Sequence, residues 1–128
     1  MTYATRQPEY EAHPKLQEAG IPVVLNAEYM EEDPLGRAEW IKFISVFFNR
    51  EKEANAYFEK IKNEYQSLEK SVHFLNGTNP TVFVNNNWQG TWNMAGGQSY
   101  VAELLRDAGA DYLWSDDTTP EASLLILK

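Results

Sequence analysis

The feature that most limits how this chain can fold is the stretch of residues 90–114, GTWNMAGGQSYVAELLRDAGADYLW. A short β-branched and aromatic run at residues 82–84 precedes it. Within it, residues 98–108 carry apolar side chains at helical spacing and end at Gly109, and a strand-like run follows. The order strand, loop, helix, strand is typical of parallel α/β units, so we expect an α/β fold.

The loop before this helix carries the best candidates for ligand binding. In parallel α/β units the loops that leave the carboxyl ends of strands line the binding crevice, which makes Trp88, Trp92 and Asn93 candidates. An exposed indole is costly unless it packs or binds, so core packing is the alternative for either tryptophan alone. We expect at least one of them, preferably Trp92, to face a ligand. Gly96 and Gly97 predict a tight turn, with an anion site at the helix start as the alternative.

Composition excludes several functional classes. The 128 residues suffice for one core, and the formal net charge of −8 would repel a nucleic-acid backbone. The chain has no cysteine, so thiol catalysis, disulfides and thiolate metal sites are excluded. His13 and His73 are isolated, and the motifs of nucleophilic elbows, phosphate loops and paired-histidine metal sites are absent. We therefore predict a non-enzymatic protein with no catalytic residue, metal site or intrinsic cofactor.

The two ends of the chain lead us to expect a piece of a larger α/β fold. The first residues lack the charged and then apolar plan of a secretory signal, and no apolar run reaches the length of a membrane span. A helix-like segment at residues 8–19 starts almost at once, and residues 123–128 are largely apolar with no turn after them.

The first third of the chain predicts a short helix and a strand. The helix, over residues 8–19, begins at Pro8, is interrupted or loosened at Pro14 and ends at Gly20. Residues 21–25 are apolar and predict a buried strand, although Pro22 lacks an amide donor and places the strand opening at an edge.

Two long helices are expected in the middle of the chain. Asp33 and Pro34 are a cap and a first-turn proline for a helix over residues 35–48 that is apolar on two sides, which predicts that it lies between two packed bodies or supports the centre of the fold. Asn49 and Arg50 break it. Residues 51–72 predict a second helix with one apolar and one charged face, and the turn at residues 75–80 predicts a lobe boundary near Asn76.

Charged residues before and at the start of the first long helix allow two interpretations each. The acidic cluster Glu28, Glu31, Glu32 and Asp33 fits an oxygen-rich cation site, or more simply the positive end of the helix dipole. Arg37 lies in the first turn, where a cation is unfavourable. Its forked guanidinium is a candidate contact for an anionic ligand group, and an ion pair to Glu39 or a neighbouring acid is the alternative.

Three segments together resemble the substrate-binding proteins of bacterial ABC importers, in the group that captures iron–siderophore complexes, haem or cobalamin. The first is residues 31–43, EEDPLGRAEWIKF; the second is residues 90–100, GTWNMAGGQSY; the third is residues 107–114, DAGADYLW. With the charged helix between them, the resemblance spans nearly the whole chain.

The resemblance implies a two-lobed α/β protein whose lobes are joined by one long helix, with the ligand held in the cleft between them. Residues 1–33 would be the tail of the first lobe, residues 34–49 the bridging helix and residues 50–128 an incomplete second lobe. The aromatic and arginine cleft contacts of the family correspond to Trp92 and Arg37 in this chain. Trp88, Asn93 and Tyr100 are further candidate contacts.

The same resemblance implies a protein outside the cytoplasmic membrane, lipid-anchored in its complete form, that delivers a metal chelate to an ABC permease. On this resemblance, we expect the given residues to lack most of the first lobe, the lipoprotein signal and the acidic residue with which the second lobe commonly docks. Its exposed lobe face is a candidate for self-association. Two other functions remain open: a metal-dependent enzyme or cofactor-processing domain that uses the acidic cluster, and a protein-interaction module that uses the exposed aromatic residues.

Overall fold

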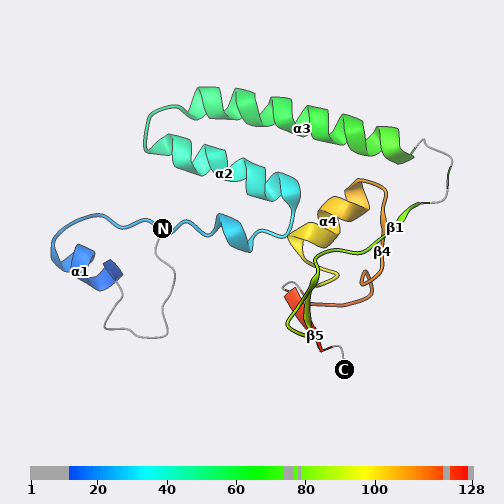
Figure 1. The fold of residues 1–128 in the computed structure, drawn as a ribbon. Coiled ribbons are helices and arrows are strands. Elements are labelled where there is room, and N and C mark those ends of the chain that lie inside the picture. Colours follow the sequence, from blue (N-terminus) through cyan, green and yellow to red (C-terminus); the bar gives the residue numbers. More distant parts are fainter. Residues whose placement is uncertain (1–11, 74–76, 78, 120–121, 127–128) are drawn as a thin grey trace. The chain divides into compact units, whose positions relative to one another are not determined.

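The computed structural model describes residues 12–73, 77, 79–119 and 122–126, drawn as coloured ribbon in Figure 1. The chain divides into two compact units, residues 1–30 and residues 31–128. Within the described ranges no helix is both long enough and apolar enough to cross a bilayer. The division into lobe tail, bridging helix and second lobe at residues 33 and 49 stays a prediction.

The first unit contains helix α1, Ala12–Glu18, and the 3-10 helix η2, Glu28–Met30. Gly20 ends α1 in the left-handed region with φ 71°, as expected for a glycine after a helix. The described helix continues through Pro14 to Glu18, so the interruption expected at Pro14 is wrong within residues 12–18. Pro8 lies outside the described residues.

The buried strand predicted for residues 21–25 is also wrong. These residues have no regular structure, and Ile21, Val24 and Leu25 are exposed. A strand needs a neighbouring ladder to satisfy its backbone groups, and no strand in the described part of the chain pairs with this segment. Apolar composition alone therefore misled the prediction.

The second unit begins with helix α2, Pro34–Val46, whose start follows the local sequence closely. Asp33 Oδ1 accepts the amide of Gly36 at 2.6 Å, and Pro34 is buried in the first turn. The chain leaves the helix at Asn49, which has a positive φ of 51°. The apolar surface of α2 exceeds what its neighbours cover, because Phe43, Ile44, Val46 and Phe47 are exposed.

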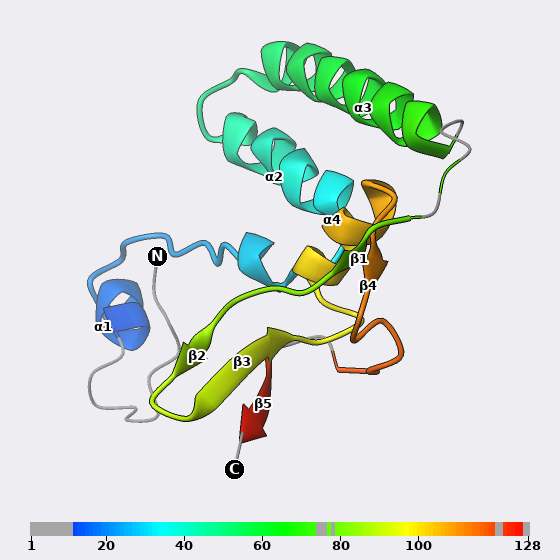
Figure 2. The ribbon, with the colours of Figure 1, turned by 45° about the vertical axis from the view of Figure 1, so that its right-hand side comes forward.

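Helix α3, Glu51–His73, runs back beside α2, and the two helices lie side by side in Figures 1 and 2. Ala54 and Phe58 are buried, and Lys42 of α2 places its Nζ 4.0 Å from the centre of the Phe58 ring. Tyr57 and Leu68 are exposed, although the sequence pattern places them on the apolar face of this helix. One short partner helix covers only part of a 23-residue helix.

A parallel strand pair and one helix form the centre of the second unit. Strand β1, Thr81–Val82, pairs in parallel with β4, Asp111–Tyr112, with Thr81 opposite Asp111. Helix α4, Tyr100–Asp107, lies between them in sequence and ends at Gly109, with φ 72°. The predicted order of strand, helix and parallel strand is therefore confirmed. The core cluster consists of Met94, Ala95, Ala102 and Tyr112.

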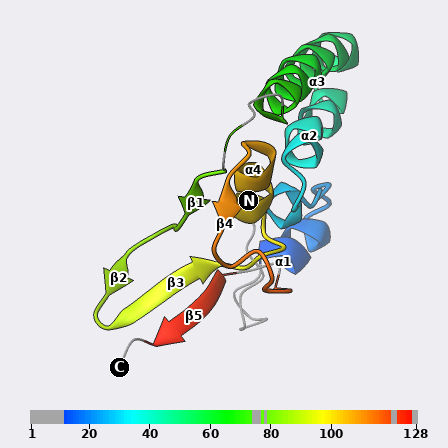
Figure 3. The ribbon, with the colours of Figure 1, turned by 90° about the vertical axis from the view of Figure 1, so that its right-hand side faces the viewer.

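The segment between β1 and α4 is a hairpin and not the long loop that we predicted. Strand β2, Asn87–Trp88, pairs antiparallel with β3, Thr91–Ala95, and β3 pairs antiparallel with β5, Ala122–Ile126 (Figures 2 and 3). Gln89 and Gly90 form the turn with φ 51° and 80°. Two positive φ values suit the right-handed twist of a tight hairpin, and this signal in Gln-Gly is weaker than in Asn-Gly.

Candidate functional site: an aromatic cluster at the ends of the parallel strands

Three aromatic side chains meet where the parallel strands end. Phe83 directly follows β1, Trp114 lies two residues after β4, and Trp92 comes from β3. The ring centre of Phe83 is 4.3 Å from that of Trp92 and 5.6 Å from that of Trp114, with interplanar angles of 57° and 49°. We call these three residues the aromatic cluster. Its place at the carboxyl ends of parallel strands is the usual position of a binding crevice in α/β folds.

The members of the aromatic cluster differ in what holds them. Trp92 is half-buried, and its Nε1 donates to the backbone carbonyl of Val84 at 2.9 Å. Trp92 and Trp114 both pack against the buried core of the unit. Phe83 rests on the two indoles and is 44% exposed, so it offers the most accessible ring of the three. Two anchored rings thus support an exposed one.

Polar backbone contacts fix the hairpin beside the aromatic cluster. Asn85 has a positive φ of 68°, and its Nδ2 donates to the carbonyl of Asn93 at 2.5 Å. Asn87 Oδ1 accepts the amide of Gly90 at 2.9 Å and closes the turn. The Asn93 side chain is exposed at this edge of β3. The Trp88 backbone belongs to β2 and its side chain lies outside the described part, so its role stays a prediction.

The core beneath the aromatic cluster is closed by a buried tyrosine. The Tyr112 hydroxyl donates to the carbonyl of Ala95 at 2.6 Å and so joins β4 to the end of β3. Burial, followed by the negative charge of Asp117, raises the pKa of Tyr112. The ring therefore stays neutral and acts as part of the scaffold.

The glycine turn before α4 is a close approach of two backbones. A Cβ at Gly97 would lie 2.3–2.6 Å from the carbonyl oxygens of Asp117, Trp114 and Ser115, so only glycine fits. Ser99 then caps α4 by accepting the amide of Ala102 at 3.3 Å. The tight-turn interpretation of the two glycines is the one that this geometry supports.

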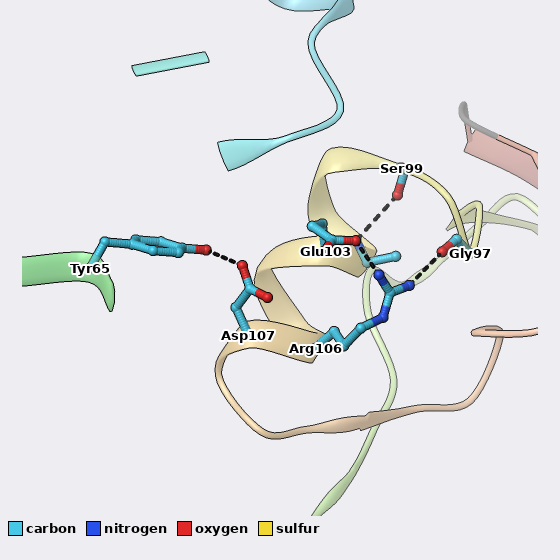
Figure 4. Close-up of polar contacts among 7 residues, drawn as sticks. Tyr65, Gly97, Ser99, Glu103, Arg106 and Asp107 are labelled. Atoms are coloured by element: carbon cyan, nitrogen blue, oxygen red, sulfur yellow. Dashed lines mark hydrogen bonds and ion pairs between the residues drawn. The ribbon is translucent and has the colours of Figure 1, made fainter. Parts of the chain in front are cut away.

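Arg106 reinforces the same turn from within α4. Figure 4 shows its guanidinium between the carboxylate of Glu103 and the carbonyl of Gly97, which it reaches at 3.3 Å. A cavity of about 280 Å³ opens beside this pair, and the residues that line it are Glu32, Asp33, Gln98, Glu103 and Arg106.

Two predicted site residues, Arg37 and Tyr100, lie against each other. The guanidinium carbon of Arg37 is 3.8 Å from the centre of the Tyr100 ring, and Nη2 donates to the carbonyl of Glu31 at 2.9 Å. Glu39 forms an ion pair with Lys42 at 2.8 Å. The aromatic contact and the carbonyl stabilise a cation at a helix start, where the dipole alone would disfavour it.

The acidic segment before α2 serves the helix itself. Asp33 caps α2, and Glu31 Oε1 accepts Trp40 Nε1 at 3.2 Å. No group of three or more metal-ligating side chains occurs among the residues that the structure describes. The contacts of Asp33 and Glu31 lie at the start of α2, where the helix-dipole interpretation expects acidic side chains. The side chains of His13 and His73 lie outside the described set.

Sequence reasoning missed two members of the aromatic cluster. Phe83 was counted only as part of a strand, and Trp114 as the end of another. The available signal was their position, since each follows a strand of the parallel pair directly or within two residues. What this arrangement can do chemically is bind a flat apolar group noncovalently, because its rings offer surface and no nucleophile or acid–base pair.

Comparison with known proteins agrees with the motifs. The chain is 37% identical over 107 residues to an uncharacterized lipoprotein of Methanocaldococcus jannaschii, covering 80% of this chain and 24% of the relative. A second uncharacterized lipoprotein of that organism is 32% identical over 107 residues, or 80% of this chain and 27% of the relative. A third, uncharacterized protein is 28% identical over 102 residues, or 79% and 31%.

The chain thus spans only about a quarter to a third of the length of these relatives. No solved structure matches it significantly. The sequence model of the periplasmic binding protein family matches residues 5–123, which is most of the chain. The chain therefore belongs to the periplasmic binding protein family, in the siderophore, haem and cobalamin type that its motifs resemble.

Proposed function

We propose that this chain forms part of the solute-binding component of an ABC importer and that its ligand is a ferric siderophore or a related metal chelate, such as haem or cobalamin. Membership of the family supports solute binding as a kind of function. The observation that carries the proposal is the aromatic cluster, whose exposed Phe83 ring lies at the carboxyl ends of β1 and β4.

The ligand would rest on the aromatic cluster and not between its rings. Ring centres 4.3 and 5.6 Å apart are in contact, so no space for a further group remains between them. A planar, conjugated part of the ligand would stack on the outer face of Phe83. Binding is capture without bond making, so the protein is not an enzyme under this proposal.

The assigned partners follow from the family and are likewise proposals. Proteins of this kind normally deliver their solute to an ABC permease. The lipoprotein relatives favour a position outside the cytoplasmic membrane, with a lipid anchor in the complete protein. The exposed apolar side chains of α2 make self-association a further expectation for this chain at high concentration.

The other predicted contacts have unequal support. The half-buried position of Trp92 and its hydrogen bond to Val84 favour a supporting role. Trp88 and Asn93 stay predicted contacts on the hairpin. Arg37 and Tyr100 stay predicted contacts as well, although their mutual stacking suggests the different role argued below.

Tryptophan fluorescence of the chain tests the proposal. The titrants are a ferric catecholate, a ferric hydroxamate, haemin, cobalamin and, as the control, a bare divalent metal salt. We expect saturable quenching by one chelate, with weak affinity because binding energy falls when part of an enclosing cleft is absent. No chelate-specific saturation in wild type, or saturation equal in Phe83→Ala, would contradict the proposal. A response to the bare metal alone would favour the metal-dependent alternative.

A further inference from the structure

We infer that Arg37 is a positioning residue: through Tyr100 it holds the start of α2 against the start of α4, and it does so in place of contacting ligand. Its guanidinium carbon lies 3.8 Å from the centre of the Tyr100 ring. At that distance the ring face attracts the cation and its flat surface packs against the planar group. The contact joins two helices 63 positions apart in sequence, from 37 to 100.

The Arg37 end of this contact is itself fixed to the segment before α2. Nη2 donates to the carbonyl of Glu31 at 2.9 Å, and the carboxylate of Glu31 accepts Trp40 Nε1 at 3.2 Å. Residue 31 is therefore tied to α2 at Arg37 and Trp40, which are one turn apart, and Asp33 caps the start of the same helix. A hydrogen bond to the backbone of residue 31 thus helps to orient the guanidinium.

Tyr100 belongs to the helix that packs on the core beneath the aromatic cluster. Tyr100 is the first residue of α4, and Ala102, two residues later, is a buried member of the core. Trp92 and Trp114 pack against this same core. Fixing the first turn of α4 therefore fixes the support on which the exposed Phe83 ring rests.

Charge placement explains why arginine is used for this contact. A cation in the first turn of a helix opposes the helix dipole, so it requires a compensating partner. The Tyr100 face and the Glu31 carbonyl provide that compensation without a ligand. Lysine would keep the charge but lose the planar stacking, so Arg37→Lys separates the two properties.

The first experiment measures the contact in the absence of ligand and does not depend on the proposed function. Urea unfolding of Arg37→Ala, Tyr100→Leu and the double variant gives the coupling between the two side chains. We expect each single variant to raise the unfolding equilibrium constant about 3- to 30-fold and the double variant to add little more. Tyr100→Phe, which keeps the ring, should retain most of the wild-type stability. Fully additive single effects would overturn the inference.

The second experiment measures binding and rests on the proposed function. The folded variants are titrated with an anionic ferric catecholate and an uncharged ferric hydroxamate, with Tyr57→Phe as a control for an exposed tyrosine. A positioning role predicts that Arg37→Lys and Tyr100→Leu weaken any chelate that wild type binds by a similar factor of about 3 to 10. Tyr100→Phe should restore affinity.

The outcomes separate three roles for Arg37. Loss confined to the anionic chelate would make Arg37 a ligand fork and overturn the inference. Unchanged affinity in every stably folded variant would reduce the contact to stability alone and also overturn it. If wild type binds no chelate, the proposed function fails, while the unfolding experiment still decides whether Arg37 and Tyr100 are coupled.

Discussion

The indole Nε1 of Trp92 donates a hydrogen bond to the backbone carbonyl of Val84 across 2.9 Å, which ties strand β3 to the segment that leaves β1. Trp92, the tryptophan that the sequence favoured as a ligand contact, is therefore held by the scaffold. The exposed surface beside it belongs to Phe83, at 44% exposure. This division of roles leads to separate predictions for the two residues.

Phe83→Ala should weaken chelate binding by about tenfold with little effect on folding, because it removes the accessible ring and leaves the two supporting indoles in place. Fluorescence titration measures the affinity, and circular dichroism checks the fold. Leu113→Ala is the matched control, since Leu113 is 57% exposed beside Trp114. Equal loss in both variants would mean that general surface apolarity, and not the Phe83 ring, binds the ligand.

Trp92→Phe should lower the free energy of unfolding by about 1 kcal/mol, because the Val84 carbonyl loses its donor while most of the aromatic packing is kept. Urea unfolding at neutral pH measures the change. If the variant keeps wild-type stability but loses chelate binding, Trp92 is a direct contact and the supporting role given to it here is wrong.

Gly97→Ala should destabilise the chain by at least about 2 kcal/mol, because the new methyl group meets three backbone carbonyl oxygens that cannot rotate away. Thermal or urea unfolding measures the loss. Gly77→Ala serves as the control, since nothing lies within 4 Å of a Cβ at that position. Similar stability in the two variants would show that the segment of residues 114–117 yields easily.

Tyr65→Phe should lower the free energy of unfolding by about 1 kcal/mol near neutral pH, because the Tyr65 hydroxyl donates to Asp107 Oδ2 at 2.6 Å and joins α3 to α4 (Figure 4). The exposed Tyr57→Phe is the control, and urea unfolding is the measurement.

The same tyrosine predicts a pH dependence. Burial first, and then the hydrogen bond to Asp107, raise the pKa of Tyr65 in the folded state. Its stabilising contribution is therefore complete below the ordinary tyrosine pKa of 10 and is lost as the pH rises above that value, since the unfolded chain ionises first. The stability difference between wild type and Tyr65→Phe should shrink as the pH rises from about 9 to about 11. A constant difference would contradict this sign.

Asp33→Ala should lower the free energy of unfolding by about 1 kcal/mol, because Gly36 loses the carboxylate that caps α2. Differential scanning fluorimetry with and without Mg²⁺, Ca²⁺ or Mn²⁺ accompanies the measurement. Metal ions should leave the melting temperature of wild type unchanged. A rise that disappears in Asp33→Ala would revive the metal-site interpretation of the acidic segment.

Sequence reasoning predicted the elements whose signals are local. Asp33 and Pro34 predict the start of α2. The apolar spacing of residues 98–108 predicts α4, and Gly109 predicts its end. The parallel pairing of β1 with β4 also followed from element order alone.

Features that depend on distant partners were not predictable in the same way. The hairpin at Trp88 and Thr91 carries a weak turn signal, and strand β3 becomes stable by pairing with β5, more than 25 residues later. Residues 21–25 are as apolar as a strand but have no ladder in the described structure. The role of Phe83 depends on two indoles, one from β3 and one from the turn after β4.

The antiparallel hairpin leaves after β1 and returns at α4, so its tip at Gln89 and Gly90 bears no part of the β1–β4 ladder. Insertions at that tip can lengthen the hairpin at low cost to the parallel strand pair, because the entropic cost of closing a surface loop grows only slowly with its length. The two-residue turn is thus the place where the hairpin can be lengthened with the least disturbance to the parallel strands.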